Sequence, residues 1–198
     1  MDYRSHSFRA QRLEGIGRTA MFNQVLDELA AQPLSDFDGL HFFWHTRSPL
    51  SQWHKASFAL SGIKYTSAEQ YMMHGKALLF GDNEAAGKIL ATDDPERQKQ
   101  LGREVKGFDP EVWTTNARRI VYEGNCGKFM QNRGLRDQLT ATGSALLVEA
   151  APEDTVWGIG LAEDDSRAQA KQTWRGTNWL GYVLTLLRED VAAFAKTI

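Results

Sequence analysis

The stretch YTSAEQYMMHGKA, residues Tyr65–Ala77, decides more about this chain than any other. Ser67 is a good helix N-cap, and Gln70 follows three residues later, where the partner of a capping box belongs. Glu69 falls in the first turn, where the helix dipole favours a carboxylate. Lys76 comes two turns later on the same face, and its side chain leans back toward the helix start. The stretch therefore predicts a helix that carries an acid and an amine on one face.

Two interpretations of this face are open from the spacing alone. A carboxylate and an amine beside Tyr71 and Met72 or Met73 make a candidate sugar or nucleotide site. The same Glu69 and Lys76 can also be surface charges that cap the helix and keep it soluble. Such exposed pairs are common and contribute little to stability, so the spacing by itself favours this second interpretation.

Composition limits the class of protein. The chain has 198 residues, of which 42% are hydrophobic and 24% charged, so one globular domain with a substantial core is expected. The net charge is −2 and no long basic block exists, which argues against strong non-specific binding to nucleic acid. The single cysteine, Cys126, excludes an intrachain disulfide and a cysteine-rich metal site, and it favours a reducing cytoplasm. Neither a secretory signal nor an apolar run of membrane-spanning length is expected.

The positions of proline, glycine and helix-capping residues predict where the helices, strands and turns of the chain begin and end. Residues 1–40 read as an N-terminal extension with one helix over about Thr19–Ala31, and residues 41–198 as the main domain. The other expected elements are a buried strand over 41–44, a hairpin around Ser61-Gly62, and helices that begin after Asp82, Asp94-Pro95 and Asp109-Pro110. Further along the chain we expect a short helix over 135–140, a strand over 145–148 and a last helix from about Asn178 to Lys196. The predicted fold class is α+β, a single helix-dominated domain with a few short strands.

Four separated blocks of sequence resemble one family. They are SPLSQW at 48–53, SAEQYM at 67–72 with Lys76-Ala77, WGIGL at 157–161 preceded by Asp154, and WRGTNWLG at 174–181. Together they resemble the NADAR, or YbiA-like, family, over about residues 41–188. Because the blocks are ordered and well separated, the match is specific.

The resemblance implies N-glycosidase activity that needs no cofactor. Some members of the family cleave phosphorylated ribosylamino-pyrimidine intermediates of riboflavin synthesis, and others remove ADP-ribose from the amino group of guanine in nucleic acid. Some accompany an ADP-ribosyltransferase toxin, which makes such a toxin a candidate partner. We expect ADP-ribosyl-guanine to be the substrate, with the ribosylamine of riboflavin synthesis as the alternative. A module that binds ADP-ribose or NAD without cleaving it is the third hypothesis.

The candidate catalytic residues are Glu69, Lys76 and Asp154. Cleavage of an N-riboside builds positive charge on the anomeric carbon, which a carboxylate such as Glu69 can stabilise. Lys76 can hold a phosphate, or it can form a Schiff base with the opened sugar if its pKa is depressed. Asp154 can bind ribose hydroxyls or act as a second acid or base, and its alternative is a turn residue.

The candidate substrate-binding residues are Trp53, Trp113, Arg118, Trp157, Gly158 and Asn178. The tryptophans can stack on a base or sugar, with core packing as the alternative. Gly158 permits close approach of the backbone to a ligand, and Asn178 can cap the last helix beside a phosphate. Arg118, with Arg119 and Lys128, is a candidate phosphate contact, and a surface charge is the alternative for at least one of the three.

Four histidines invite a metal-site hypothesis: His41, His45, His54 and His74. His41 and His45 lie four residues apart in a predicted strand, where they share a face only loosely, and no acidic cluster joins them. We therefore expect no metal at this site.

Overall fold

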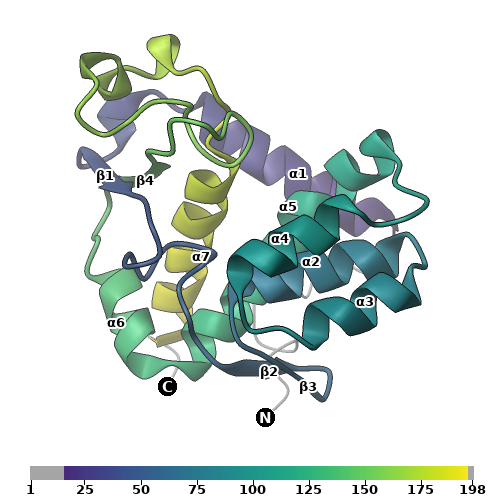
Figure 1. Ribbon diagram of the computed structural model, residues 1–198. Coiled ribbons are helices and arrows are strands. Elements are labelled where there is room, and N and C mark those ends of the chain that lie inside the picture. The colour runs from purple at the N-terminus through teal and green to yellow at the C-terminus, as the bar shows by residue number, and fades with distance from the viewer. Residues whose placement is uncertain (1–15, 196–198) are drawn as a thin grey trace. The chain divides into compact units, whose positions relative to one another are not determined.

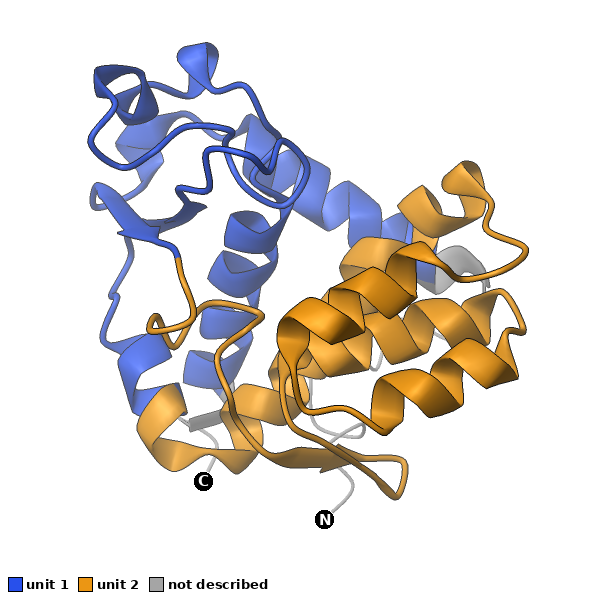
Figure 2. Ribbon diagram, in the orientation of Figure 1, with its two compact units in different colours: residues 1–44, 136–198 blue, residues 45–135 orange. Residues whose placement is uncertain are grey.

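The computed structural model describes residues 16–195 of the 198, with side chains described for residues 19–193. It has the predicted α+β class, with long helices and two small sheets (Figure 1). The described chain divides into two compact units, one of residues 45–135 and one formed by the segments before and after it (Figure 2). Within the described residues, none of the helices combines the length and the apolar character needed to cross a membrane.

The unit of residues 45–135 is built on a hairpin and four helices. Strands β2 (Phe58–Leu60) and β3 (Ile63–Tyr65) pair antiparallel, and the turn between them has positive φ at Ser61 and Gly62, as an Asn-Gly-like two-residue turn requires. Helix α2 (Ala68–Leu79) packs against α3 (Asn83–Leu90), α4 (Pro95–Arg103) and α5 (Pro110–Gln131). The hairpin and these helix positions confirm the predictions from the sequence.

Aspartate caps set the starts of three helices in this unit. The carboxylate of Asp82 accepts from Ala85 N at 3.0 Å, and that of Asp109 accepts from Glu111 N at 2.8 Å. Asp94 caps α4 in the same way, and a proline occupies the first helical position of both α4 and α5. A proline there gives up only an amide that has no partner inside the helix, so the Asp-Pro pairs fix both boundaries.

The other unit has a two-stranded parallel sheet. Strand β1 (Leu40–Phe43) pairs with β4 (Leu146–Glu149), with Leu40 opposite Leu146. The first three residues of β4 are fully buried, as predicted, but in β1 only Phe43 is buried and Trp44 is 42% exposed. The strand is therefore present, but the prediction that it is buried over 41–44 is wrong for most of its residues, because β1 has a strand partner on one edge only.

Helices complete this second unit. Helix α7 (Trp179–Ala195) packs on β4 and on α1 (Ile16–Ala31), which confirms the helix predicted in the N-terminal segment and starts it three residues earlier. Lys171 Nζ donates to Ala30 O at 2.6 Å and to Gln32 O at 2.8 Å, so a lysine caps the carboxyl end of α1. Residues 1–15 of the predicted extension lie outside the described residues, and its boundary at residue 40 stays a prediction. The short helix α6 (Arg133–Thr140) and the 3-10 turns at Leu34–Asp36, Ser166–Gln169 and Lys171–Thr173 connect these elements.

Candidate functional site

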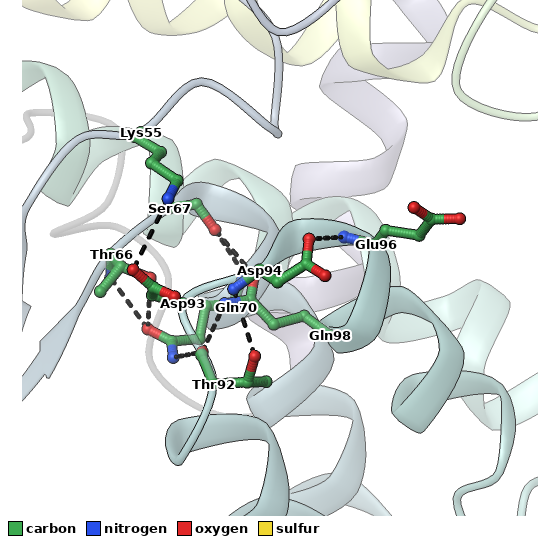
Figure 3. A network of polar contacts seen from close by, with 9 residues as sticks. All are labelled: Lys55, Thr66, Ser67, Gln70, Thr92, Asp93, Asp94, Glu96 and Gln98. Carbon is green, nitrogen blue, oxygen red and sulfur yellow. Dashed lines mark hydrogen bonds and ion pairs between the residues drawn. The ribbon is translucent and has the colours of Figure 1, made fainter.

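A buried polar network holds the start of α2 in place (Figure 3). Ser67 Oγ accepts from Gln70 N at 3.0 Å and donates to Gln98 Oε1 at 3.0 Å. Gln70 Oε1 accepts from Thr66 N at 2.8 Å, one residue before the cap, while its Nε2 donates to Thr92 O at 2.8 Å. Gln98 Nε2 donates to the same carbonyl. The capping pair predicted from the sequence is thus present, and it also ties α2 to the connection between α3 and α4.

Glu69 lies in this first turn and is only 5% exposed. Glutamate is rarely buried unless other groups of the protein compensate for its charge. Its backbone N–H donates to Gln52 O at 3.0 Å, which joins the first turn of α2 to the loop of residues 48–53. The burial of Glu69 argues against the surface-charge interpretation, although its catalytic role stays a prediction.

Lys76 lies on α2 among aromatic rings. Its Nζ donates to Gly102 O at 2.8 Å and lies 4.2 Å from the centroid of the Phe108 ring and 5.5 Å from that of Trp113. Burial lowers the pKa of Lys76, and the positive charge of Arg103 lowers it further. A lowered pKa increases the neutral fraction of the amine, which is the form that attacks carbon.

Exposed apolar surface surrounds Lys76. Phe108 is 44% exposed and Val112 41% exposed, and the Phe80 and Phe108 rings meet edge to face at 5.4 Å. Val112, near the start of α5, is exposed and Trp113 is only half buried, so core packing does not fully account for Trp113. An exposed aromatic face beside a lysine suits stacking of a nucleobase.

Trp53 and Arg118 occupy different surroundings. Trp53 is half buried at the end of the loop of residues 48–53, with Lys99 Nζ 5.6 Å from its ring centroid. Arg118 is buried on α5, with 9% exposed, so the surface-charge alternative does not describe it. Its neighbour Arg119 pairs with Glu123 at 2.5 Å, which also accepts from Tyr71 Oη at 3.1 Å. The structure thus assigns a protein partner to Arg119, and the binding roles of Trp53 and Arg118 stay predictions.

Two buried polar side chains of this unit, Gln52 and Asn125, were not chosen as site residues from the sequence, and a third, Lys128, was considered there only as a phosphate contact. Gln52 Oε1 accepts from Asn125 Nδ2 at 2.6 Å, and Lys128 Nζ donates to Ser51 O at 2.8 Å. Asn125 and Lys128 are both 0% exposed. Their positions continue the apolar stripe of α5 at helical spacing from Val121, and a polar residue on such a stripe is the signal that could have identified them.

The remaining candidates lie together in the other unit. Asp154 Oδ1 accepts from Val156 N at 2.9 Å and Trp157 N at 2.7 Å, so Asp154 is a turn residue, and within the described residues its Oδ2 has no hydrogen-bond partner. The rings of Trp157 and Trp179 meet edge to face at 5.7 Å. Gly158 is packed so closely that an added Cβ would lie 2.8 Å from Glu149 O. The space that this glycine leaves is therefore filled by the protein's own backbone.

Asn178 connects β4 to the start of α7. Its Oδ1 accepts from Glu149 N at 3.0 Å and its Nδ2 donates to Leu147 O at 3.0 Å, and the residue is fully buried. Its φ is +52°, whereas an N-cap residue usually has an extended backbone. The side chain therefore bonds the strand instead of capping its own helix. Both the oxygen and the nitrogen of its side-chain amide already form hydrogen bonds within the protein. A role of Asn178 in substrate binding stays a prediction.

Metal ligation has no support in the described part of the chain. There, no three histidine, cysteine, aspartate or glutamate side chains are grouped so that they could hold an ion. His74 Nδ1 instead lies 3.1 Å from Tyr65 Oη, and His54 Nδ1 lies 3.0 Å from Thr46 O.

Comparisons with known proteins agree with the resemblance in the sequence. The NADAR domain family model matches residues 42–192. The chain is 42% identical to "N-glycosidase R617" of Acanthamoeba polyphaga mimivirus, over 77% of this chain and 88% of that protein. It is 30% identical to "Riboflavin biosynthesis protein VVA0006" of Vibrio vulnificus, over 74% of this chain but only 36% of that protein. The NMR structure of the Escherichia coli protein YbiA superposes with a TM-score of 0.67 at 25% identity, over 82% of this chain and 90% of that one.

Proposed function

This chain belongs to the NADAR family and is an N-glycosidase, and we propose that it removes ADP-ribose from the amino group of guanine in nucleic acid. The observation that carries the proposal is the arrangement on α2. Glu69 is buried in the first turn, and Lys76 follows seven residues later with a lowered pKa and two aromatic rings beside its amine. Seven helical residues span about 10 Å along the axis, which is the scale of one nucleoside.

The proposed reaction uses the amine of Lys76 as a nucleophile. The bond between the anomeric carbon and the ring oxygen breaks, the ring oxygen takes a proton from water, and the lone pair of the amino nitrogen forms a protonated imine at the anomeric carbon. Neutral Lys76 Nζ then adds to that carbon. A proton moves from Nζ to the guanine amino nitrogen, which leaves, and the sugar remains bound to Lys76 as a Schiff base. Water then adds to this Schiff base, and its collapse releases ADP-ribose and the free lysine. Glu69 stabilises the cationic carbon and transfers protons between the nitrogens and water.

The aromatic surface beside Lys76 supports a substrate with a base. Phe108 is 44% exposed and Trp113 half buried, so a base can stack on these rings from solvent. A small phosphorylated ribosylamine needs a more enclosed site. The similarity to a riboflavin biosynthesis protein keeps this ribosylamine as the second candidate substrate.

The experiment that tests the proposal compares these substrates directly. Purified protein is incubated with an oligonucleotide that carries ADP-ribosyl-guanine, or with a phosphorylated ribosylamino-pyrimidine, and the products are identified by mass. Glu69→Gln removes the carboxylate, and Glu96→Gln makes the same change at an exposed first-turn glutamate of α4 as the matched control. Release of ADP-ribose by the wild type and by Glu96→Gln, but not by Glu69→Gln, supports the proposal. Cleavage of the pyrimidine alone supports the second candidate.

If neither substrate is cleaved, the result favours the third hypothesis, a module that binds ADP-ribose without cleaving it. Titration calorimetry with ADP-ribose then measures binding without turnover. An ADP-ribosyltransferase toxin as partner and a cytoplasmic location both stay predictions.

A further inference from the structure

The loop of residues 48–53 is held by two polar side chains of α5. Lys128 Nζ donates to Ser51 O at 2.8 Å, and Asn125 Nδ2 donates to Gln52 Oε1 at 2.6 Å. Asn125 and Lys128 are one helical turn apart, so they present adjacent donors to consecutive residues of the loop. The same loop also contacts α2, where Gln52 O accepts from Glu69 N at 3.0 Å. The loop therefore lies between α5 and the first turn of α2.

Lys128 is an unusual residue for a structural contact. It is 0% exposed, and among the described residues no carboxylate forms an ion pair with it. Burial of an unpaired amine is unfavourable, and here burial lowers the pKa of Lys128 to about 7. A leucine or methionine would fill much of the same space without desolvating an amine, so what the amine adds at this position is its hydrogen bond to Ser51 O.

Asn125 is a second buried polar residue of α5 in an energetically unfavourable state. Its Nδ2 donates both to Gln52 Oε1 and to Val121 O, while its Oδ1 is buried without a hydrogen-bond partner in the described part of the chain. Unsatisfied buried acceptors are few in native proteins and are often found near functional sites. Two neighbouring polar groups on α5 are thus held in unfavourable states, and both contact the loop of residues 48–53.

We propose that Lys128 is a positioning residue of the N-glycosidase site, which fixes the Ser51–Gln52 peptide so that Gln52 O can hold the first turn of α2 and orient Glu69. Asn125 acts with it by fixing the Gln52 side chain. Lys128 touches no substrate in this role, which replaces the phosphate contact considered from the sequence. The inference rests on the proposed function, because it requires Glu69 to act in the reaction.

Lys128→Met tests the role, because it keeps an unbranched side chain only one heavy atom shorter and removes the donor. Lys128→Arg is the conservative variant that keeps a donor. Leu139→Ala, a fully buried position of the other unit, is the control for general loss of stability. Loss of positioning typically lowers turnover by about 100-fold. We expect Lys128→Met to lower kcat to this extent with little change in KM, Lys128→Arg to recover part of kcat, and Leu139→Ala to leave kcat unchanged.

Hydrogen exchange at the Glu69 amide gives a readout that does not depend on turnover. Its N–H is bonded to Gln52 O, so we expect faster exchange in Lys128→Met than in Leu139→Ala at equal stability. If kcat and Glu69 exchange change no more in Lys128→Met than in Leu139→Ala, the proposal is wrong. If exchange at Glu69 increases but Glu69→Gln is fully active, the positioning contact stands and the catalytic assignment of Glu69 fails instead.

Discussion

The amine of Lys76 lies 4.2 Å from the centroid of the Phe108 ring, and both are held at a surface where Phe108 remains 44% exposed. The face of the Phe108 ring attracts the charged ammonium form of Lys76, whereas burial and the positive charge of Arg103 disfavour it. The net result is a lowered pKa of Lys76. A lysine in this state loses its proton at a lower pH than a solvated one. This relationship leads to the first two predictions.

Lys76→Ala is expected to abolish N-glycosidase turnover while the protein remains folded, because the amine that forms the Schiff base is gone. Borohydride added during turnover should trap a covalent sugar adduct on the wild type, detected by mass. Lys88→Ala changes an exposed lysine in the last turn of α3 and should behave as the wild type. An active wild type that yields no adduct would count against the imine route and favour direct attack by water.

Arg103→Gln is expected to shift the pH profile of kcat to higher pH. The positive charge of Arg103 lowers the pKa of Lys76, so its removal raises that pKa and decreases the neutral amine at pH 7. The rate should therefore fall at neutral pH and recover at alkaline pH. Arg97→Gln, on the exposed side of the same helix α4, is the matched control. A profile that is unchanged in Arg103→Gln would mean that ionisation of Lys76 does not limit the rate.

Asn178→Ala is expected to destabilise the protein by about 2–4 kcal/mol, because two buried backbone groups lose their partners at once. These groups are Glu149 N and Leu147 O of β4. Urea denaturation measures the effect, with Asn116→Ala as the control, since Asn116 bonds only Val112 O of its own helix. If Asn178→Ala is as stable as the wild type but binds substrate poorly, the ligand role predicted from the sequence is the correct one.

His74 should make the protein less stable in acid. Burial lowers its pKa in the folded state, so the unfolded chain binds more protons below about pH 6.5, and stability is lost as the pH falls through this range. His74→Asn removes this titration and should flatten the dependence of unfolding free energy on pH between 7 and 5. His41 is exposed on β1, yet partial desolvation and the positive charge of Arg188 lower its pKa as well, so His41→Asn should remove a separate and smaller part of the slope. Equal slopes for the wild type and both variants would contradict the assignment.

The sequence by itself determined the local structure and the family. Capping residues act within one turn of the chain, so Ser67, Asp82 and the Asp-Pro pairs placed helix starts correctly without any tertiary information. The positive-φ turn at Ser61-Gly62 is equally local, and it gave the hairpin. Glu69 and Lys76 were placed on one helix for the same reason.

Only the tertiary structure decided which of these side chains are buried and what they contact. Asn178 looks like a helix cap in the sequence, yet its amide bonds a strand about 30 residues earlier in the chain. Lys128 looks like a surface charge, yet its amine is enclosed and bonds Ser51, 77 residues away. Burial and long-range hydrogen bonds depend on how distant segments pack, and no spacing rule within one segment contains that information. The chemistry of Lys76 and Lys128 depends on their desolvation, so it could not be predicted before the fold was known.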